Sequence, residues 1–294
     1  MKTQSVNENS ILLALNESAC KQCGICVAEC PHHKTKGETR HVDHSFEYCD
    51  KCQHCYSVCP QHAIEIVPDG ITGSWPAIDP ELFLRHLMYR RSYRRFKSGP
   101  IPRKVMDTLL DAARFIPSGG NDHRFQITLL TSDRVRQELL KSIHRYYSRL
   151  LRLMRHPLVK ELLKLIGDPK VKATLREPEN LKKIIYAINM IHGEDDAVFY
   201  NAPAVLFFHT DRIMPTAGED CLLSAYNIAL QAETLGLGSC FVSLSQQAVN
   251  ENKKCKQLLS IPPNHFVYAV LVLGYPVRKY LRPAVRPKKE VSYA

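Results

Sequence analysis

The sequence predicts an α+β protein built from two domains of unequal size, and three observations support this prediction. The chain has 294 residues, whereas a single domain usually has roughly 100–200. Eight of its eleven cysteines fall within residues 20–59, which sets the N-terminal part apart from the rest. Beyond it, apolar stripes at helical spacing alternate with short apolar runs typical of buried strands, such as 125–130 and 266–273.

Charge also separates the two parts. Residues 1–79 contain 6 Lys and Arg against 10 Asp and Glu, which leaves 34 against 19 for the remaining 215 residues. A basic larger domain suits an anionic cofactor or an acidic partner such as a small electron carrier, although a basic surface that faces only water is an open alternative. No nucleic-acid-binding motif accompanies the charge, so we expect no nucleic-acid partner.

The sequence also bears on where the protein resides. No apolar run approaches the roughly 20 residues needed to span a bilayer, and the N-terminus does not resemble a signal peptide. The cysteines fall at metal-ligand spacing rather than in the pattern of a small secreted disulfide scaffold. We therefore expect a cytoplasmic protein without membrane association.

Two cysteine runs repeat the pattern C-x2-C-x2-C-x3-C-P. The first cysteine run is Cys20, Cys23, Cys26 and Cys30, and the second is Cys49, Cys52, Cys55 and Cys59. In this pattern three successive cysteines wrap one [4Fe–4S] cluster, and the fourth reaches the other cluster. We therefore assign Cys20, Cys23, Cys26 and Cys59 to one cluster, and Cys49, Cys52, Cys55 and Cys30 to the second. A pair of zinc sites is the alternative, but zinc sites require neither the third cysteine of each run nor the proline.

The cysteine-rich part resembles bacterial two-cluster ferredoxins over about residues 15–70, including CPQHAI at 59–64. The resemblance implies a small ferredoxin-like domain, taken as residues 1–70, that depends on its clusters for folding and passes single electrons. A turn-rich linker follows at 71–79. Asp79 and Pro80 then provide an N-cap and a first-turn proline for a helix that begins near residue 80.

The predicted helix ends in RRSYRRF at 90–96, here called the arginine segment. Arginine forks and a serine hydroxyl suit a phosphate group, which carries close to two negative charges. Alternatively, the arginines complement the negative end of a helix dipole or face water. A second helical pattern stops at Pro117, and the glycines of SGGN at 118–121 would let backbone N–H groups approach a planar or anionic ligand. An ordinary helix-ending loop is the alternative there.

Residues 78–294 resemble the FMN-dependent nitroreductase family through several pieces in matching order. The pieces are RRSYRRF at 90–96, LLDAARFIPSGGN at 109–121, FYNAPAVLFFHTD at 199–211, AYNIALQAETLGLGSCFVSL at 225–244, VLVLGYP at 270–276 and RPKKEV at 286–291. The resemblance implies a nitroreductase-like α/β sandwich over 80–294, in which helices flank a mixed, mainly antiparallel sheet. It also implies a homodimer with FMN at the interface.

The same resemblance implies which residues bind FMN. The arginine segment would hold the phosphate, the loop after the second helix would lie against the flavin, and the backbone after GLGS would approach the ring. A basic residue near the C-terminus would complete the phosphate site. These residues are Arg90, Arg91, Ser92, Arg94, Pro117, Ser118, Asn121, Val242, Ser243, Leu244 and Arg286, with Arg282 and Lys288 as weaker candidates than Arg286. No catalytic side chain is assigned, and His123 and Tyr93 are only weak candidates for a proton donor.

Two features depart from the family. The family often continues its asparagine with a glutamine and an aromatic pair, whereas this chain has Asp122, His123 and Arg124. A helical insertion at about 133–197 separates two predicted strands, and we expect its helices to pack on the dimer, with a lid over the flavin as the alternative. The three remaining cysteines are expected to be buried small hydrophobes. They are Cys221, Cys240 and Cys255.

Together these features predict an iron–sulfur flavoprotein oxidoreductase. A donor such as ferredoxin or flavodoxin, or NAD(P)H, would load the two clusters, and the clusters would reduce FMN. The flavin would then reduce a small organic acceptor of the nitroaromatic, quinone or enone type. A redox sensor or scaffold that binds flavin and clusters without turnover is the alternative function.

Overall fold

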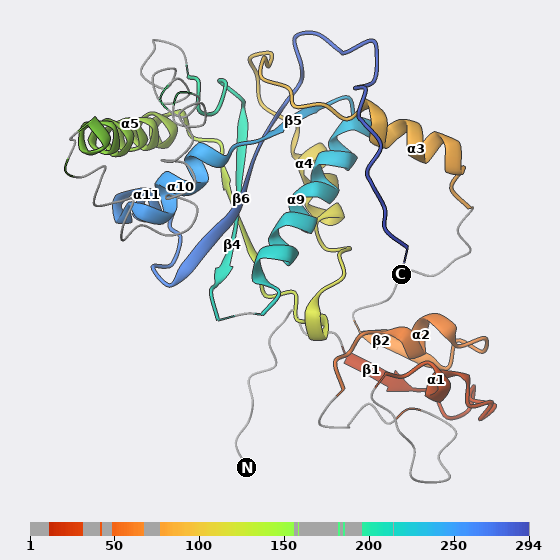
Figure 1. Cartoon of the computed structure of the whole chain (residues 1–294). Coiled ribbons are helices and arrows are strands. Elements are labelled where there is room, and N and C mark those ends of the chain that lie inside the picture. Colours follow the sequence, from red (N-terminus) through yellow and green to blue (C-terminus); the bar gives the residue numbers. More distant parts are fainter. Residues whose placement is uncertain are drawn as a thin grey trace, which may run out of the picture. The chain divides into compact units, whose positions relative to one another are not determined.

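The computed structural model describes two compact units of the chain (Figure 1). The smaller unit comprises Met1–Ala77 and Ser118–Asp122, and the larger comprises Ile78–Pro117 and His123–Ala294. The described residues are 12–31, 42, 49–67, 77–155, 158, 182, 185, 196–213 and 215–293. Most of the predicted linker at 71–79, and most of the predicted insertion beyond Arg155, lie outside the described residues.

The smaller unit contains a two-stranded sheet and two short helices. Strands β1 (Leu12–Leu15) and β2 (Ile64–Val67) pair in antiparallel fashion. Helices α1 (Ile25–Ala28) and α2 (His54–Val58) lie within the two cysteine runs. The buried side chains of the core cluster in this unit are Val42, Cys55 and Ile64. Such a small apolar core contributes little to folding, and units of this size usually depend on a bound metal, disulfides or a partner for their stability.

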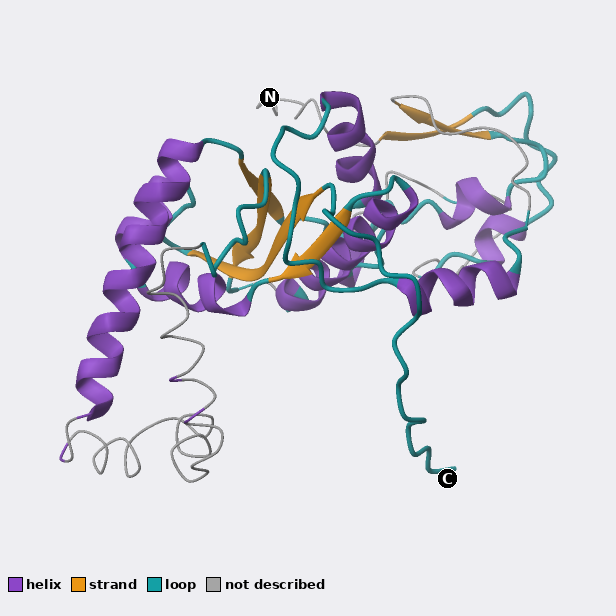
Figure 2. Cartoon of the chain, turned by 90° about the horizontal axis from the view of Figure 1, so that it is seen from above, coloured by secondary structure: helices purple, strands orange, loops and turns teal. Residues whose placement is uncertain are grey.

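The larger unit contains a four-stranded sheet (Figure 2). Its strands are β3 (Gln126–Leu130), β4 (Ala204–Asp211), β5 (Gly238–Phe241) and β6 (His265–Gly274). They lie in the order β3-β4-β6-β5, and each neighbouring pair is antiparallel. A parallel bridge between Ser92 and Ser239 joins the arginine segment to β5. The predicted mainly antiparallel sheet is confirmed, and the apolar runs at 125–130 and 266–273 form β3 and β6.

Helices cover both faces of this sheet, as Figure 1 shows. They are α4 (Arg103–Ala112), α5 (Asp133–Arg155), α9 (Ala217–Thr234), α10 (Ser243–Glu251) and α11 (Lys253–Leu258). Leu206 and Phe208 of β4 share one buried cluster with residues of α4 and α9, whereas Val205 and Phe207 share the other with residues of α5, α10 and α11. Successive strand residues point to opposite faces. Covering both faces therefore buries β4 at every position from Ala204 to Thr210.

Helix α3 (Pro80–Tyr89) begins as the sequence predicts. The Asp79 carboxylate accepts a hydrogen bond of 2.7 Å from the Leu82 backbone N–H, and Pro80 occupies the first turn. This cap satisfies one of the N–H groups that a helix start leaves without a partner. The helix leads directly into the arginine segment, whose first residue, Arg90, is its C-cap.

A buried histidine pair connects β4 with β6. His209 Nδ1 lies 2.9 Å from His265 Nδ1, and His209 Nε2 lies 2.9 Å from Thr128 Oγ1. Since the two Nδ1 atoms face each other, only one of them can carry the proton of their hydrogen bond. Burial lowers the pKa of His209 from its ordinary 6.5 to about 4, with smaller contributions from the charges of His265 and Lys256.

The histidine pair predicts that the larger unit becomes less stable as the pH falls from 6.5 to about 4. In this interval the unfolded chain binds a proton at His209 that the folded chain does not bind, so the free energy of unfolding should fall by about 3 kcal/mol in total. Above pH 7 the His209 imidazole is neutral in both states, so it does not make the free energy of unfolding depend on pH. Urea unfolding followed by circular dichroism at several pH values measures the effect. His209→Gln cannot titrate and should flatten the slope, so equal slopes in the two proteins would contradict the assignment.

Candidate functional site

The two cysteine runs fold with the same backbone pattern. In the first run Gln22 and Gly24 have positive φ angles of 52° and 77°, and in the second run Lys51 and Gln53 have φ angles of 51° and 66°. Each pair stands 29 positions from its counterpart, as the first cysteines of the two runs do. In each run the two left-handed residues flank the second cysteine, which is Cys23 or Cys52. They bend the chain tightly, so that the first three cysteines of the run can face one centre.

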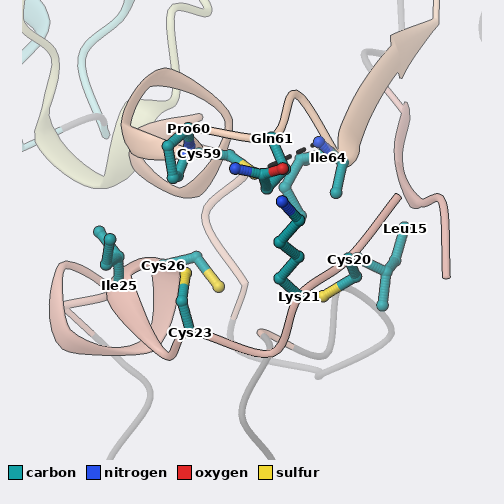
Figure 3. A pocket seen from close by; sticks show the side chains of 11 residues that line it. Leu15, Cys20, Lys21, Cys23, Ile25, Cys26, Cys59, Pro60, Gln61 and Ile64 are labelled. Carbon is teal, nitrogen blue, oxygen red and sulfur yellow. Dashed lines mark hydrogen bonds between the residues drawn. The ribbon is translucent and has the colours of Figure 1, made fainter. Parts of the chain in front are cut away.

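Four cysteines from both runs line one pocket of the smaller unit (Figure 3). Cys20, Cys23 and Cys26 come from the first run, and Cys59 comes from the end of the second. The rest of the wall is mostly apolar, with Leu15, Ile25, Pro60, Ala63 and Ile64. The backbone N–H of Ala63 also donates to the Cys59 thiol sulfur over 3.2 Å. Four thiols around an apolar space form a donor set suited to iron. The structure thus brings together the four cysteines predicted for one cluster.

The other four predicted ligands are Cys49, Cys52, Cys55 and Cys30. Burial, with smaller contributions from the neighbouring thiols of Cys52, Cys26 and Cys30, raises the pKa of the Cys55 thiol to about 11, although a hydrogen bond from the Tyr56 backbone opposes the rise. Cys26 and Cys30, both from the first run, therefore lie close to Cys55 of the second. A metal is needed to hold such a thiol in its deprotonated form, because the thiolate is the metal ligand. None of the eleven cysteines, all of which the structure describes, forms a disulfide.

The arginine segment runs along the edge of the sheet beside β5. The Tyr93 backbone N–H donates to Ser239 O over 2.9 Å, and the Lys97 N–H donates to Tyr275 O over 2.8 Å. The Tyr93 side chain is buried against Gly238, at which a Cβ atom would come within 2.5 Å of the tyrosine ring. The segment therefore has a fixed position on the sheet rather than the freedom of an ordinary surface loop.

The three predicted phosphate-binding arginines contact aromatic rings. Arg90 lies 5.9 Å from the ring centre of Tyr226, Arg91 lies 5.0 Å from that of Tyr280, and Arg94 lies 5.8 Å from that of Tyr200. In the described ranges none of the three forms an ion pair with a carboxylate. Three cations that are oriented by rings and form no ion pair with a carboxylate in these ranges fit an anionic ligand such as a phosphate.

The aromatic partners were not foreseen from the sequence. Tyr200, Tyr226 and Tyr280 are distant from the arginine segment along the chain and carry no motif that links them to it. Glu233 was also missed: it accepts a hydrogen bond of 3.4 Å from the Tyr93 hydroxyl. Burial raises the pKa of Tyr93, and the charge of Glu233 adds to this effect. Such a buried phenol is a poor proton donor, which favours a packing role for Tyr93.

The remaining predicted flavin contacts lie in three places. Val242 directly follows β5 and is the N-cap of α10, with its N–H bonded to Val270 O over 2.9 Å, and Ser243 and Leu244 begin α10. Pro117 belongs to the larger unit, whereas Ser118 and Asn121 belong to the smaller one. The C-terminal basic candidates are exposed, and the chain around them forms neither helix nor strand. They are Arg286, Arg282 and Lys288.

The three cysteines outside the runs are buried, as predicted. The exposed fractions of Cys221, Cys240 and Cys255 are 0%, 2% and 0%. Burial raises the pKa of all three thiols, although the charge of Arg94 and a hydrogen bond from Ser92 oppose the rise at Cys240. Buried, protonated thiols are unreactive, so these residues serve as core side chains.

Comparison with known proteins covers both parts of the chain. Residues 87–275 match the nitroreductase family, and residues 12–60 match the 4Fe-4S dicluster domain. A solved nitroreductase with bound FMN from Bacteroides fragilis is 21% identical, with a TM-score of 0.50, and the match covers 71% of this chain and 94% of that one. Another with bound FMN from Desulfitobacterium hafniense is 19% identical, with a TM-score of 0.52 and coverage of 72% and 97%. A search among curated proteins finds no match.

In the part of the chain that the structure describes, no helix combines the length and apolar character needed to cross a bilayer.

Proposed function

The chain belongs to the nitroreductase family, and on this premise, together with its 4Fe-4S dicluster domain, we propose that it is an iron–sulfur flavoprotein oxidoreductase. Electrons from a donor such as ferredoxin or flavodoxin, or from NAD(P)H, pass through two [4Fe–4S] clusters to FMN and then to a small organic acceptor. The observation that supports this most directly is the presence in one chain of a four-thiol pocket and a phosphate-suited arginine segment.

The cysteines divide between two clusters in this proposal. Cys20, Cys23, Cys26 and Cys59 hold one, because they line one pocket. The second is held by Cys49, Cys52, Cys55 and Cys30; Cys52 and Cys30 lie close enough to Cys55 to affect its pKa, as does Cys26 of the first cluster. Each cluster exchanges one electron, so two clusters can supply the pair that most organic acceptors require.

The larger unit holds FMN in this proposal. Arg90, Arg91, Ser92 and Arg94 bind the phosphate, with help from Arg286, and the backbone of Val242, Ser243 and Leu244 faces the flavin ring together with Pro117, Ser118 and Asn121. Bound FMN would accept electrons singly and pass them on in pairs. The chain itself supplies charge for the phosphate, a rigid backbone beside the ring and exclusion of water.

The acceptor class is a small reducible organic molecule of the nitroaromatic, quinone or enone type. No side chain of the described residues is assigned to proton transfer; Tyr93, one of the two weak candidates, is buried against Gly238 and bonded to Glu233. We further propose a homodimer, because helix α3 exposes apolar side chains that a second copy would cover. The exposed fractions of Leu82, Leu84 and Met88 are 65%, 57% and 45%.

Anaerobic purification followed by cofactor analysis tests the proposal. We expect about eight iron atoms and about eight sulfides per chain, together with one FMN. Photoreduction of the clusters should then bleach the flavin absorbance, and an added quinone or nitroaromatic should be consumed in repeated turnovers. Flavin that stays oxidised beside reduced clusters would contradict the electron path. Bleaching without turnover of any acceptor would favour the redox sensor instead.

Replacing Arg90 with alanine should weaken FMN binding. A hydrogen bond to a charged group contributes about 1.5–3 kcal/mol, so the dissociation constant should rise about 10- to 100-fold. Fluorescence titration of the FMN-depleted protein with FMN measures this. Arg95→Ala is the matched control, because Arg95 lies in the same segment, is exposed and is not among the predicted phosphate ligands. Equal affinities in the two variants would remove the argument for a phosphate site at Arg90.

A further inference from the structure

Lys21 lines the four-thiol pocket of the smaller unit. It stands between the first two cysteines of the first run, Cys20 and Cys23, and its side chain points toward Gln61, as Figure 3 shows. Among the described residues that line this pocket, Lys21 is the only one besides the four cysteines that can carry a charge, and Glu29 of the first run is not among them. The wall of a mostly apolar space suited to an iron–sulfur cluster therefore contains one cation.

The apolar wall and the lysine act in opposite directions on a cluster held there. Taking up one electron adds a negative charge to a centre that its four thiolate ligands already make negative. Apolar surroundings disfavour the added charge, because they solvate it less well than water does. A positive charge in the same wall stabilises the added charge, and it does so more strongly beside an apolar space than in water. The Lys21 ammonium should therefore raise the reduction potential of the cluster.

Two backbone N–H groups act in the same direction as the lysine. The Gln22 N–H donates to the Cys20 sulfur over 3.4 Å, and the Ala63 N–H donates to the Cys59 sulfur over 3.2 Å. Hydrogen bonds to ligand sulfurs favour the more negative, reduced state of a cluster. Both bonds are made to cysteines of the pocket that Lys21 lines.

The second cysteine run has the opposite charge at the equivalent position. The two runs share one cysteine spacing and one pattern of left-handed residues, in which Lys21 corresponds to Asp50, 29 positions later. The next residues are the neutral Gln22 in the first run and Lys51 in the second. Between its first two cysteines, the first run thus has a net positive charge, whereas the charges of the second run cancel. The sequence alone makes the two runs unequal in their effect on an added electron.

We propose that Lys21 tunes the cluster of the first cysteine run: its ammonium raises the reduction potential of that cluster above the potential of the second, so that the first electron taken up by the smaller unit settles there. This inference rests on the proposed function, because it requires both clusters. A donor of the ferredoxin type loses one electron and the cluster gains it. No bond forms or breaks in this step, and no proton is required.

The test is redox potentiometry of the full-length, anaerobically purified protein, followed by electron paramagnetic resonance. Lys21→Gln removes the charge and keeps an unbranched polar side chain. We expect the higher of the two cluster midpoints to fall and the lower one to stay. At the wild-type value of the higher midpoint, the ratio of reduced to oxidised cluster should fall about fivefold, because a unit charge beside a partly exposed centre contributes an energy of this order. For a one-electron centre this is a shift of about 40 mV.

Further variants separate charge from packing. Lys21→Arg keeps the charge and should keep both midpoints, whereas Lys21→Glu reverses it and should shift the higher midpoint about twice as far as Lys21→Gln. Lys51→Gln is the matched control from the second run. Glutamine suits that position, because Gln22 at the equivalent place has a φ angle of 52° and Lys51 one of 51°. This control should leave the higher midpoint unchanged.

If the midpoints of Lys21→Gln equal those of the wild type while both clusters are present, the inference is wrong and the proposed function stands. A shift confined to the lower midpoint contradicts it too, as does the same shift in Lys21→Arg as in Lys21→Gln, because the effect then arises from packing. Loss of iron from all the Lys21 variants would also overturn it, because the residue would then serve cluster assembly. A wild-type protein without two clusters would overturn the proposed function itself, so the two failures are distinguishable.

Discussion

Replacing Cys59 with alanine should remove about four of the about eight iron atoms per chain, and the loss should fall on the cluster of the first cysteine run. Cys59 is the last cysteine of the second run, yet its thiol lines the same pocket as Cys20, Cys23 and Cys26. A cubane that loses one of four thiolate ligands in a small domain is exposed to solvent and to loss of iron. Iron analysis of the anaerobically purified variant measures the effect.

Double variants identify which cluster is lost. Cys23→Ala combined with Cys59→Ala should retain about half of the iron, because both residues serve the same cluster. Cys52→Ala combined with Cys59→Ala should lose nearly all of it, because they serve different clusters. If each run instead held its own cluster, the two double variants would exchange results. Cys255→Ala, at a buried cysteine of the larger unit, is the control and should keep all of the iron.

Loss of both clusters should also unfold the smaller unit. Its sheet has two strands of four residues each, and two-stranded sheets are at best marginally stable in water. Without iron, the buried Cys55 thiol regains its proton, because burial raises its pKa to about 11. The folding free energy of this unit therefore comes largely from metal binding. The larger unit, whose sheet is covered on both faces, needs no such support.

Much of the fold could be predicted because it depends on local patterns. The apolar run at 266–273 forms β6, and Asp79 followed by Pro80 starts α3. The predicted insertion begins as the helix α5, and its buried residues Leu139, Ile143 and Leu151 pack on the sheet of the same chain. The spacing of three and four residues in such a stripe is visible in the sequence.

The composition of the site was less predictable. The position of Cys59 could be predicted, because in proteins with this motif the fourth cysteine of one run is known to bind the cluster of the other run. No such rule predicts which rings lie beside the arginines. Nor does one predict that Asn121 binds the backbone oxygens of Asp50 and Lys51. These partners are separated from their residues by about 70 to 190 positions. Only the folded chain brings them together, so a single sequence carries no signal for them.

Gly238 holds the arginine segment in place, and adding one methyl group there should displace that segment. A Cβ atom at Gly238 would lie 2.5 Å from Cγ and 2.7 Å from Cδ2 of Tyr93, closer than carbon atoms can approach. Tyr93 cannot easily move away. The centre of its ring lies 4.8 Å from that of the Tyr280 ring. Its hydroxyl donates to Glu233, and its backbone N–H donates to Ser239 O. Relief of the clash must therefore shift the backbone that carries the neighbouring Ser92 and Arg94.

Gly238→Ala should accordingly lower the free energy of unfolding of the larger unit by about 1–3 kcal/mol and weaken FMN binding about tenfold or more. Urea unfolding and FMN titration measure the two effects. Gly218→Ala is the control, because a Cβ atom there would approach Tyr268 only to 3.2 Å and alanine favours the surrounding helix α9. If FMN binding weakens with little loss of stability, the clash shifts only the arginine segment, as expected if this segment binds the phosphate. If stability falls but the affinity for FMN is unchanged, the arginine segment does not bind FMN, because the clash can affect FMN binding only by moving that segment.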